Sequence, residues 1–554
     1  MNKKVCSFPI LFALLALLIG TCAVVFPASA QAAPTSTGSI TVSGTVASSY
    51  DAYQIFSANV VDGDSDAKIA TDLAWASDAV RDVALPVLHS AGMPNSQTTA
   101  QEAAEWLNAD SHLTSALSAQ LARSLQSSGT ASRALNAGTA AELPCGYWLI
   151  VADDDAIAQN EAGTAPIMAL VGGSAVTVKP KAATPKVSKH VLEDSTAAWQ
   201  KAADATVADD LYWRLSATVP AGLTAYDTYA VQFVDTMSAG LDPSKVAASM
   251  RVYVAAGADG GFGAVSAGKD GRAGTEPAKG WTDITAQCRV SVDGKTFTVR
   301  TGDLIAALGG TDTFTAGARV VAVYNAPLNS ACNHGIAKGN PNEVYLRYPR
   351  SPLADQSGDA GFTRTPSDDA CVYTWDLALT KRGSDGDKPL AGAVLSIADD
   401  RGRTLAADGT WDAEGKATVT SGEDGRVTVS GVDSGKLEVR ELKAPKGYTT
   451  FEGARSVTVK AEGLDVDQVA AAKPKLTITA ESPLRADSAD GSTGSLEASI
   501  INTPTGTPPS ITTGGFMPLT GDMAMYAVAA AAVAGAALVV VALLIRRGGG
   551  SYKE

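Results

Sequence analysis

Residues 437–448 read Leu437-Glu-Val-Arg-Glu-Leu-Lys-Ala-Pro-Lys-Gly-Tyr448, alternating apolar and polar side chains before a Pro-Lys-Gly turn signal. Alternation with a period of two is typical of a strand with one buried face. Leu437, Val439 and Glu441 then share that face, so the pattern places a carboxyl group among apolar side chains. This stretch predicts a β-sheet domain with an acidic residue in its core.

Two lysines occupy the same kind of position in other predicted strands. Lys189 is flanked at strand spacing by valines within residues 187–191, and Lys381 follows two leucines at the same spacing within residues 377–381. A buried ammonium group without a partner is unstable, so each lysine is expected to lose its proton or to pair with an acid. The alternative is that each lysine ends its strand and extends its amine to solvent.

The central part of the chain divides into three modules. Residues 33–180 combine strand patterns with helical spacing over residues 66–125, which predicts a mixed α/β domain. Residues 185–350 contain strand-like runs separated by Gly, Asp and Pro, which predicts an all-β sandwich. Residues 372–506 repeat short strand patterns. The expected fold is mainly β, with tandem immunoglobulin-like β-sandwich domains preceded by a mixed α/β domain.

Both ends of the chain carry targeting features. Residues 1–30 have a basic start, an apolar run and a small-residue cleavage site, which indicates a secretory signal peptide; an uncleaved membrane anchor is the alternative. Residues 507–516 form a spacer rich in Pro, Thr and Gly. Residues 523–545 carry no charge and are long enough to span a bilayer as a helix, and the basic tail at residues 546–554 favours the cytoplasmic side.

A pentapeptide stands directly before this apolar span: Met517, Pro518, Leu519, Thr520 and Gly521. It resembles the LPXTG sorting signal of Gram-positive surface proteins, with methionine in place of the first leucine. The resemblance implies that a sortase cleaves between Thr520 and Gly521 and transfers the Thr520 carbonyl to an amine. Membrane anchoring would then be transient, and the final location would be the cell wall of a Gram-positive bacterium.

The third module resembles the collagen-adhesin B-type (CnaB) domains of Gram-positive pilins. Residues 437–448 are similar to the E-box of that family, and residues 500–502 fit its closing strand. In the family a first-strand lysine, an E-box glutamate and a last-strand asparagine form an intramolecular isopeptide bond. The resemblance implies that Lys381, Glu441 and Asn502 take these roles here.

The second module resembles the isopeptide-forming fimbrial domain. Residues 233–241 are similar to its acid-bearing segment and residues 339–346 to its last strand. The resemblance implies that Lys189, Asp235 and Asn342 form a second isopeptide bond. Asn340 and Asn325 are close rivals of Asn342 and remain open.

Burial supplies the chemistry of such a bond. In an apolar core the lysine loses its proton and becomes a nucleophile, while the carboxylic acid keeps its proton. The acid then polarises the asparagine carbonyl and shuttles protons as ammonia leaves. The reaction runs once per molecule, so the chain is expected to modify itself without being an enzyme that turns over.

One lysine near the first linker is a candidate for polymerisation. Residues 176–181, Val176-Thr-Val-Lys-Pro-Lys181, resemble the pilin motif WxxxVxVYPK, although the tryptophan and the tyrosine are absent. The resemblance implies that Lys181 receives Thr520 of the next molecule, which gives a head-to-tail fibre. Lys179 and Lys186 are possible substitutes, and a plain basic linker is the alternative.

Composition and missing motifs exclude other classes of function. The 554 residues carry a formal net charge of −14, which does not suit a nucleic-acid binder. No phosphate-binding, dinucleotide-binding or nucleophile-elbow motif occurs, the histidines have no metal spacing, and no cofactor is expected. Four cysteines remain after secretion and allow three full pairings, none of which the spacing selects: Cys145, Cys288, Cys332 and Cys371.

Together, these resemblances imply a major shaft pilin that supports adhesion. Its expected partners are a pilus-specific sortase, the housekeeping sortase with peptidoglycan, and further pilin subunits, including a tip or minor pilin. The sequence does not indicate a host ligand or separate a shaft pilin from a minor one. The first alternative is a monomeric wall-anchored adhesin, which would use every feature described above except Lys181. A secreted wall-bound enzyme is the second alternative and needs a catalytic cluster that the sequence does not show.

Overall fold

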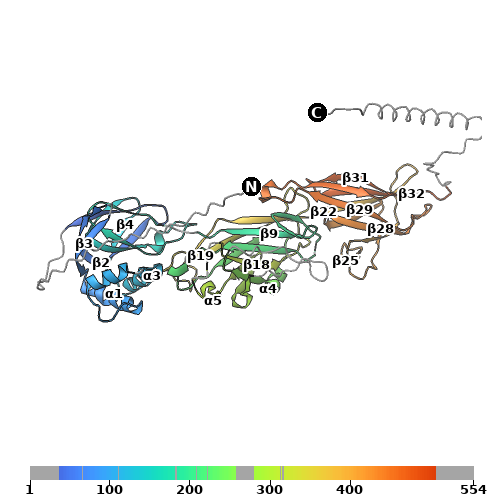
Figure 1. Ribbon diagram of the computed structural model, residues 1–554. Coiled ribbons are helices and arrows are strands. Elements are labelled where there is room, and N and C mark those ends of the chain that lie inside the picture. The colour runs from blue at the N-terminus through green and yellow to red at the C-terminus, as the bar shows by residue number, and fades with distance from the viewer. Residues whose placement is uncertain are drawn as a thin grey trace, which may run out of the picture.

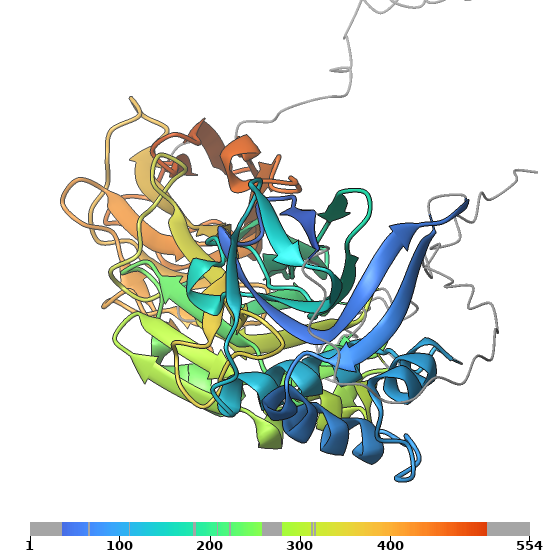
Figure 2. The same cartoon turned by 90° about the vertical axis from the view of Figure 1, so that its left-hand side faces the viewer.

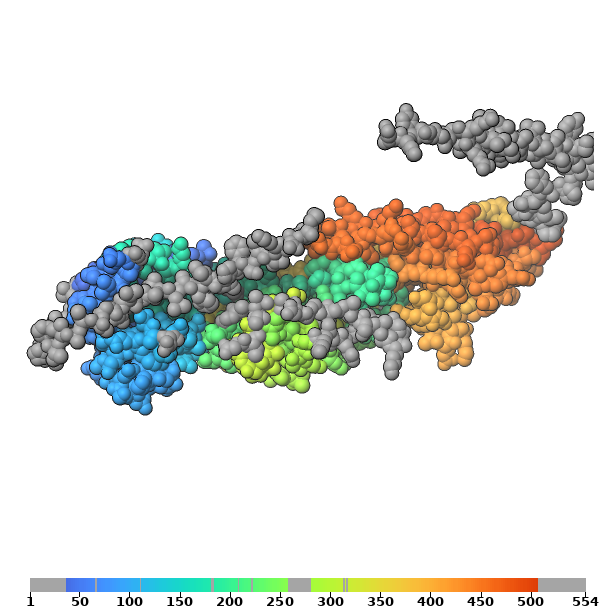
Figure 3. Space-filling view, in the orientation of Figure 1, coloured from blue at the N-terminus to red at the C-terminus, as the bar shows by residue number. Residues whose placement is uncertain are grey.

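The computed structural model describes residues 36–506, except for 65–66, 110, 181–183, 208, 221–222, 258–279, 312–313 and 315–316. The predictions for residues 1–30, for Lys181 and for residues 507–554, which contain the sorting signal, lie outside the described residues. Within the described part, no helix is long and apolar enough to cross a membrane. The described residues form three modules in a row, with the first module at one end and the third at the other (Figures 1 and 3).

The first module places three helices against one of two sheets. Its elements are β1 (Thr37–Val42), β2 (Ser49–Asp62), β3 (Lys68–Trp75), α1 (Asp78–Ser90), α2 (Ala100–Asn108), α3 (Ser115–Ser127), β4 (Arg133–Asn136), β5 (Ala140–Pro144), β6 (Gly146–Ala152), the 3₁₀ turn η2 (Asp154–Ala156), β7 (Ile167–Val171) and β8 (Val176–Val178). The sheets have the orders β3-β2-β6-β7, with β4 also paired to β2, and β5-β1-β8. The helices cover one face of the larger sheet, against a core that includes Phe56 and Leu149 (Figure 2).

The second module is a β-sandwich. Its elements are β9 (Val187–Glu193), β10 (Ala198–Gln200), β11 (Ala202–Asp204), β12 (Tyr212–Thr218), η3 (Leu223–Ala225), β13 (Gln232–Met237), η4 (Pro243–Lys245), α4 (Val246–Ser249), β14 (Arg251–Ala255), β15 (Thr282–Asp283), η5 (Thr285–Gln287), β16 (Arg289–Asp293), β17 (Thr296–Arg300), α5 (Leu304–Ala307), β18 (Arg319–Asn325), β19 (Asn340–Pro349), β20 (Phe362–Arg364) and β21 (Asp368–Tyr373). One sheet has the order β10-β9-β12-β18-β14-β15. The other has the order β11-β21-β19-β13-β17-β16, with β20 paired to β19. The inward faces of the two sheets enclose one apolar core.

The third module is a smaller sandwich. Its elements are β22 (Trp375–Gly383), β23 (Val394–Ala398), β24 (Thr404–Leu405), β25 (Trp411–Asp412), β26 (Val419–Thr420), β27 (Arg426–Val432), β28 (Gly435–Lys443), β29 (Ala454–Glu462), η7 (Val469–Ala471), β30 (Lys475–Ala480), β31 (Leu484–Asp490) and β32 (Ser495–Asn502). One sheet has the order β27-β22-β32-β31, in which β22 and β32 run parallel. The other has the order β25-β24-β23-β28-β29-β30, with β26 paired to β23.

The second module extends further along the chain than the sequence pattern indicates. The sequence pattern predicted that the second module ends at residue 350 and that the third begins at residue 372. In the structure, β20 and β21 both pair with β19 of the second module. The physical reason is that a strand joins the sheet that satisfies its backbone hydrogen bonds, and pattern alone does not identify that sheet. The predicted fold class itself, tandem β domains behind a mixed α/β domain, is confirmed.

Polar contacts join the modules at both junctions. Arg123 of α3 donates to Asp227 and to the carbonyls of Ala225 and Pro352 in the second module, at 3.0–3.1 Å. At the other junction, the buried Asp204 accepts hydrogen bonds from the Trp375 indole at 2.7 Å and from the backbone and hydroxyl of Ser434. The three modules therefore meet through hydrogen-bonded contacts as well as through linkers.

Candidate functional site

The third module brings together the three residues assigned to its isopeptide bond. Lys381 on β22 pairs in parallel with Ile500 on β32, so the side chain of Asn502 lies on the same sheet face one pleat further on. Glu441 comes from β28 in the opposite sheet. Lys381 is fully buried, and Glu441 and Asn502 are 5% and 2% exposed. Lys381 therefore does not extend its amine to solvent, and Glu441 faces the core as its strand spacing indicated.

These three side chains contact one another directly. The Lys381 amine donates to Asn502 Oδ1 and lies 3.2 Å from Glu441 Oε1. The amide nitrogen of Asn502 donates to both carboxyl oxygens of Glu441, at 2.9 and 2.8 Å. The backbone N–H of Phe451 also donates to Glu441, and its ring lies under the amine, 5.9 Å from the ring centre. The lysine nitrogen therefore lies at the side-chain amide that it would attack.

Burial favours the reactive form of Lys381. Desolvation lowers the pKa of Lys381 to about 8, although the nearby Glu441 opposes this shift. About a tenth of the amine is then uncharged at pH 7, far more than for an ordinary lysine, and only the uncharged amine carries the lone pair that a nucleophile needs. The arrangement can support attack of the amine on the amide carbon with the carboxyl group beside the leaving nitrogen.

The second module also brings its assigned residues into one buried cluster, with a different division between the sheets. Lys189 lies on β9 in one sheet. Asp235 on β13 and Asn342 on β19 lie in the other, where Asp235 pairs with Val344, two residues beyond Asn342. The same spacing of two places Asp235 and Asn342 on one face. All three residues are fully buried.

A tyrosine hydroxyl stands at the centre of this second cluster. The Lys189 amine donates to Asp235 Oδ2, and at 2.8 Å to the hydroxyl of Tyr324. That hydroxyl also accepts from the Asn342 amide at 2.8 Å and donates to Asp235 Oδ2 at 3.0 Å. Asp235 Oδ1 and Asn342 Oδ1 are buried without a hydrogen-bond partner. Tyr324 therefore connects the amine, the acid and the amide.

Burial sets the protonation of this cluster. It lowers the pKa of Lys189 to about 8 and raises the pKa of Asp235, with the attraction between the two opposing both shifts. Burial also raises the pKa of Tyr324 well above its usual value, so the hydroxyl stays protonated and can donate. A neutral amine beside a protonated acid is the combination that the expected chemistry requires.

The two rival asparagines have other partners. Asn340 accepts from the Asn333 N–H at 2.8 Å, and its amide nitrogen donates to the Asn333 and Val372 carbonyls. The amide of Asn325 accepts from Leu211 N and donates to Asp210. Of these three asparagines, Asn342 is the one hydrogen-bonded to the lysine cluster.

Tyr324 is a member of the second buried cluster that the sequence did not indicate. It ends the apolar run of residues 318–324, and Val320, Ala322 and Tyr324 share one of its faces. Both faces of this strand are buried, so the available signal was a tyrosine inside a continuous apolar run, because a buried tyrosine hydroxyl needs a hydrogen-bond partner. Which partner it finds depends on the opposite sheet.

The substitute lysines for polymerisation lie in the connection between the first two modules. Lys179 follows β8 and Lys186 precedes β9, and both are exposed. Lys181 lies between them, outside the described residues. The four cysteines are all free thiols, and no group of His, Cys, Asp or Glu arranged for a metal ion occurs in the described residues.

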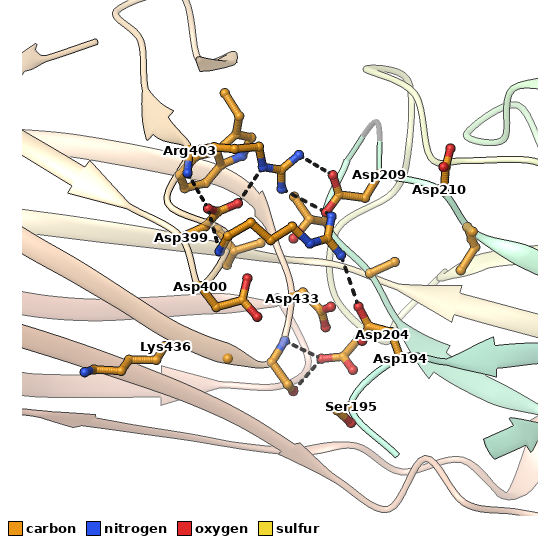
Figure 4. Close-up of a pocket in the computed structure, with 18 of the residues that line it drawn as sticks. Asp194, Ser195, Asp204, Asp209, Asp210, Asp399, Asp400, Arg403, Asp433 and Lys436 are labelled. Atoms are coloured by element: carbon orange, nitrogen blue, oxygen red, sulfur yellow. Dashed lines mark hydrogen bonds and ion pairs between the residues drawn. The ribbon is translucent and has the colours of Figure 1, made fainter. Parts of the chain in front are cut away.

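An acidic cavity of about 870 Å³ lies between the second and third modules, away from both lysine clusters. Arg403 donates to Asp399 of its own module and to Asp209 of the second module (Figure 4). Asp433 lies nearby, and its pKa is raised well above the usual value by burial and by neighbouring carboxylates, of which Asp204 acts most strongly. The charged groups of this cavity join the two modules and include no lysine–asparagine pair.

Comparison with known proteins finds similarity over the third module. Residues 376–473 match the family described as SpaA, prealbumin-like fold domain. The third module is similar to a SpaA domain. The chain is 31% identical over 134 residues to the trypsin-resistant surface T6 protein of Streptococcus pyogenes serotype M6. That match covers 23% of each protein, so it spans less than a quarter of the relative's length.

Two solved structures are similar to this chain at low identity. The T6 backbone pilin of serotype M6 Streptococcus pyogenes is 16% identical with a TM-score of 0.45, and the match covers 85% of this chain and 98% of that one. The full-length major pilin SpaD from Corynebacterium diphtheriae is 15% identical with a TM-score of 0.40, over 85% and 98% of the two chains. The sequence motifs predicted a similarity to Gram-positive pilins, and these comparisons confirm that similarity.

Proposed function

We propose that this chain is the structural subunit of a covalent pilus shaft on the surface of a Gram-positive bacterium, where it supports adhesion. The observation that carries the proposal is the presence of two buried clusters of lysine, acid and asparagine in consecutive β-sandwich modules. Buried charged residues are rare unless they have a role. Two such clusters with the same three residue types favour a shared chemistry over accidental burial.

In each cluster the lysine Nζ forms a bond to the asparagine Cγ, and the asparagine amide nitrogen leaves as ammonia. The carboxyl group protonates the departing nitrogen and recovers the proton that the amine loses, so the acid is unchanged at the end. In the third module the bond closes a loop between positions 121 residues apart. For loops of about 120 to 150 residues, the entropy relation derived for disulfides suggests a stabilisation of about 5 kcal/mol per bond.

Polymerisation is proposed to join the sorting signal of one subunit to a lysine in the connection between the first two modules of the next. A pilus-specific sortase cleaves between Thr520 and Gly521 and joins the Thr520 carbonyl to Lys181 of the next subunit, with Lys179 and Lys186 as the alternatives. The housekeeping sortase then attaches the last subunit to peptidoglycan. Two observations support this proposal. The lysines on either side of Lys181 are exposed, and the two solved structures named above are a backbone pilin and a major pilin. A head-to-tail contact of this kind gives a filament.

A monomeric wall-anchored adhesin is the second candidate function. It keeps both internal bonds and the sorting signal and loses only the joint at Lys181. The departures of residues 176–181 from the pilin motif are the specific observation that favours it. An enzyme that turns over is not proposed, because the chemistry of the two lysine clusters consumes its own side chains.

Wall extracts of the source organism, boiled in detergent and blotted for residues 31–520, test the proposal. A ladder of regularly spaced high-mass bands is expected from the wild type. Lys181→Ala should collapse the ladder to one band, while Lys179→Ala and Lys186→Ala should keep it. A single band near the monomer mass in the wild type would establish the monomeric adhesin instead. Intact mass of the monomer separately tests the internal bonds, each of which removes one ammonia.

A further inference from the structure

A cysteine, a histidine and an aspartate meet at the junction of the second and third modules. Cys332 and His334 lie in the segment between β18 and β19 of the second module, and Asp376 lies on β22 of the third. These three residues are called the Cys332 cluster below. Neither the isopeptide chemistry nor the proposed polymerisation uses any of them.

The contacts of the Cys332 cluster form a chain. The Cys332 sulfur lies 3.6 Å from His334 Nε2, and His334 Nδ1 lies 2.8 Å from Asp376 Oδ1. Cys332 is 9% exposed, whereas the side chains of His334 and Asp376 are 28% and 36% exposed. The imidazole thus lies between the thiol and a carboxylate, at the edge of the protein surface.

Backbone contacts hold the segment of the cluster in place. The Asn333 N–H donates to Asn340 Oδ1 at 2.8 Å, and the Gly335 N–H donates to the carbonyl of Thr374 at 3.0 Å. Gly335 has a φ of +76° and packs so closely on Gly494 of the third module that a Cβ atom would overlap the backbone there. The position of His334 relative to Asp376 is therefore set by the contact between modules.

The electrostatics of the Cys332 cluster favour an ion pair. The hydrogen bond to Asp376 raises the pKa of His334 to about 10, and the contact with Cys332 acts in the same direction. The imidazole is then protonated at neutral pH, with one N–H directed to Asp376 and the other to the sulfur. An imidazolium beside a thiol stabilises the thiolate, which is the nucleophilic form of cysteine.

We propose that Cys332 is a reactive thiolate, activated by His334 and positioned by Asp376, that exchanges with small-molecule disulfides. The sulfur of Cys332 attacks one sulfur of the disulfide R–S–S–R. A new S–S bond forms between Cys332 and that sulfur, the S–S bond of the reagent breaks, and its other half leaves as R–S⁻; the disulfide is itself the oxidant. The exchange makes the module junction a site of reversible thiol modification.

The chain contains its own control thiol in Cys288. Cys288 is more exposed than Cys332, but burial raises its pKa to about 11. If solvent access decided the rate, Cys288 would react first. If the fraction of thiolate decided it, Cys332 would react first. Burial also raises the pKa of Cys371 to about 11, so this thiol is expected to be slow as well.

The test treats the secreted, folded protein with an aromatic disulfide reagent at pH 6.5 and maps the modified cysteines by mass spectrometry. An ordinary thiol is about 1% ionised at that pH, so a full thiolate gains about 100-fold in reactive fraction. A thiolate of low pKa is also a weaker nucleophile than one of high pKa. This cancels roughly half of the 100-fold gain on a logarithmic scale and leaves about tenfold. Cys332 should therefore react about tenfold faster than an ordinary thiol, and should outpace Cys288, whose pKa is raised to about 11, by a larger factor. Equal rates, a faster Cys288, or Cys332 already in an internal disulfide would overturn the proposal.

Two variants and a pH profile separate activation from structure. His334→Gln should slow Cys332 to the rate of an ordinary thiol and leave Cys288 unchanged. Asp376→Asn should keep the reaction at pH 6.5 but lower the pH at which His334 loses its proton, so the rate profile of Cys332 shifts. In the wild type, the rate of Cys332 should be nearly flat from pH 6 to 8, while that of Cys288 rises with pH. If His334→Gln does not fold, this wild-type profile still decides the matter, because a rising Cys332 profile contradicts a preformed thiolate.

Discussion

The two lysine clusters contain the same residue types and are built differently. In the third module, Lys381 and Asn502 lie on neighbouring parallel strands of one sheet and the acid comes from the opposite sheet. In the second module, Asp235 and Asn342 share a sheet and the lysine comes from the opposite one. A bond in the third module would join two strands side by side, whereas a bond in the second would join the two sheets of the sandwich.

The contacts inside the clusters differ as well. The Lys381 amine touches the oxygen of its asparagine, and Glu441 holds the amide nitrogen with both oxygens. In the second module, the hydroxyl of Tyr324 binds both the lysine and the asparagine. The comparison teaches that burial of the three residue types can be reached through either sheet arrangement, and that the second arrangement depends on a fourth residue.

The largest expected effect comes from removing one acid. Glu441→Gln should prevent the bond in the third module only, because no carboxyl group remains to move protons there. Intact mass should show the loss of one ammonia instead of two, and the third module should lose about 5 kcal/mol of stability against denaturant. Asp235→Asn should have the same effect on the second module only.

Glu438→Gln is the matched control for the third module. Glu438 lies on the exposed face of the same strand as Glu441, in a surface ion pair with Lys436, so its removal should leave both bonds and change stability little. Loss of two ammonias in Glu441→Gln would show that the acid is not needed, and the proposed chemistry of that cluster would be wrong.

The next effect is a pH dependence that distinguishes a free lysine from a bonded one. In Asn502→Ala, Lys381 keeps its acid but has no amide to attack. Its pKa is about 8 in the folded state and near 10.5 in the unfolded chain, so the unfolded chain binds more protons between these values. Stability should therefore rise with pH, by about 3 kcal/mol from pH 8 to pH 10.5.

Denaturant unfolding of Asn502→Ala against the double variant with Lys381→Met isolates this lysine from all others. The difference between the two should grow across that pH range. The wild type, in which the amine is consumed, should show no such contribution from Lys381. A rise in the wild type equal to that of Asn502→Ala would indicate that its lysine is free and that the bond has not formed.

The smallest expected effect concerns Tyr324, which belongs to the cluster of the second module and has no counterpart in the third. Tyr324→Phe removes the hydroxyl that binds Lys189, Asp235 and Asn342, and each unsatisfied buried group costs about 1–3 kcal/mol. The bond in the second module should form at least about tenfold more slowly, while the bond in the third keeps its rate. Cell-free synthesis sampled over time and read by intact mass measures both rates.

Tyr348→Phe controls for the loss of a buried hydroxyl. The Tyr348 hydroxyl donates to the carbonyl of Glu161 in the first module and takes no part in the hydrogen bonds of the Lys189 cluster. Its removal should therefore leave both rates unchanged. If Tyr324→Phe forms its bond as fast as the wild type, the hydroxyl would be a packing feature and the two clusters would react by the same contacts.

The sequence was most informative where a property is local. The spacing of two in residues 187–191, 377–381 and 437–441 placed Lys189, Lys381 and Glu441 on the faces of apolar residues, the family resemblance favoured inward lysines over lysines that reach solvent, and all three side chains are buried. It was less informative at the end of the second module, where β20 and β21 join a sheet that their own pattern does not identify. The role of the asparagines followed from a family resemblance, because an inward asparagine has no distinctive period of its own.

The residues that need a distant partner were found only in the folded structure. The hydroxyl of Tyr324 meets Asp235 across 89 residues of sequence, and His334 meets Asp376 across a module boundary. Nothing in the local pattern of either residue indicates those partners. The Cys332 cluster was therefore invisible in a sequence whose cysteines and histidines are scattered.

The sequence by itself determined the class of fold and which side chains share a strand face, because alternation along a strand depends only on neighbouring residues. The tertiary structure alone decided which inward side chains meet, because strand order and register join segments more than a hundred residues apart. That pairing places the Lys381 amine at Asn502, inserts Tyr324 into the second cluster, and brings His334 against Asp376.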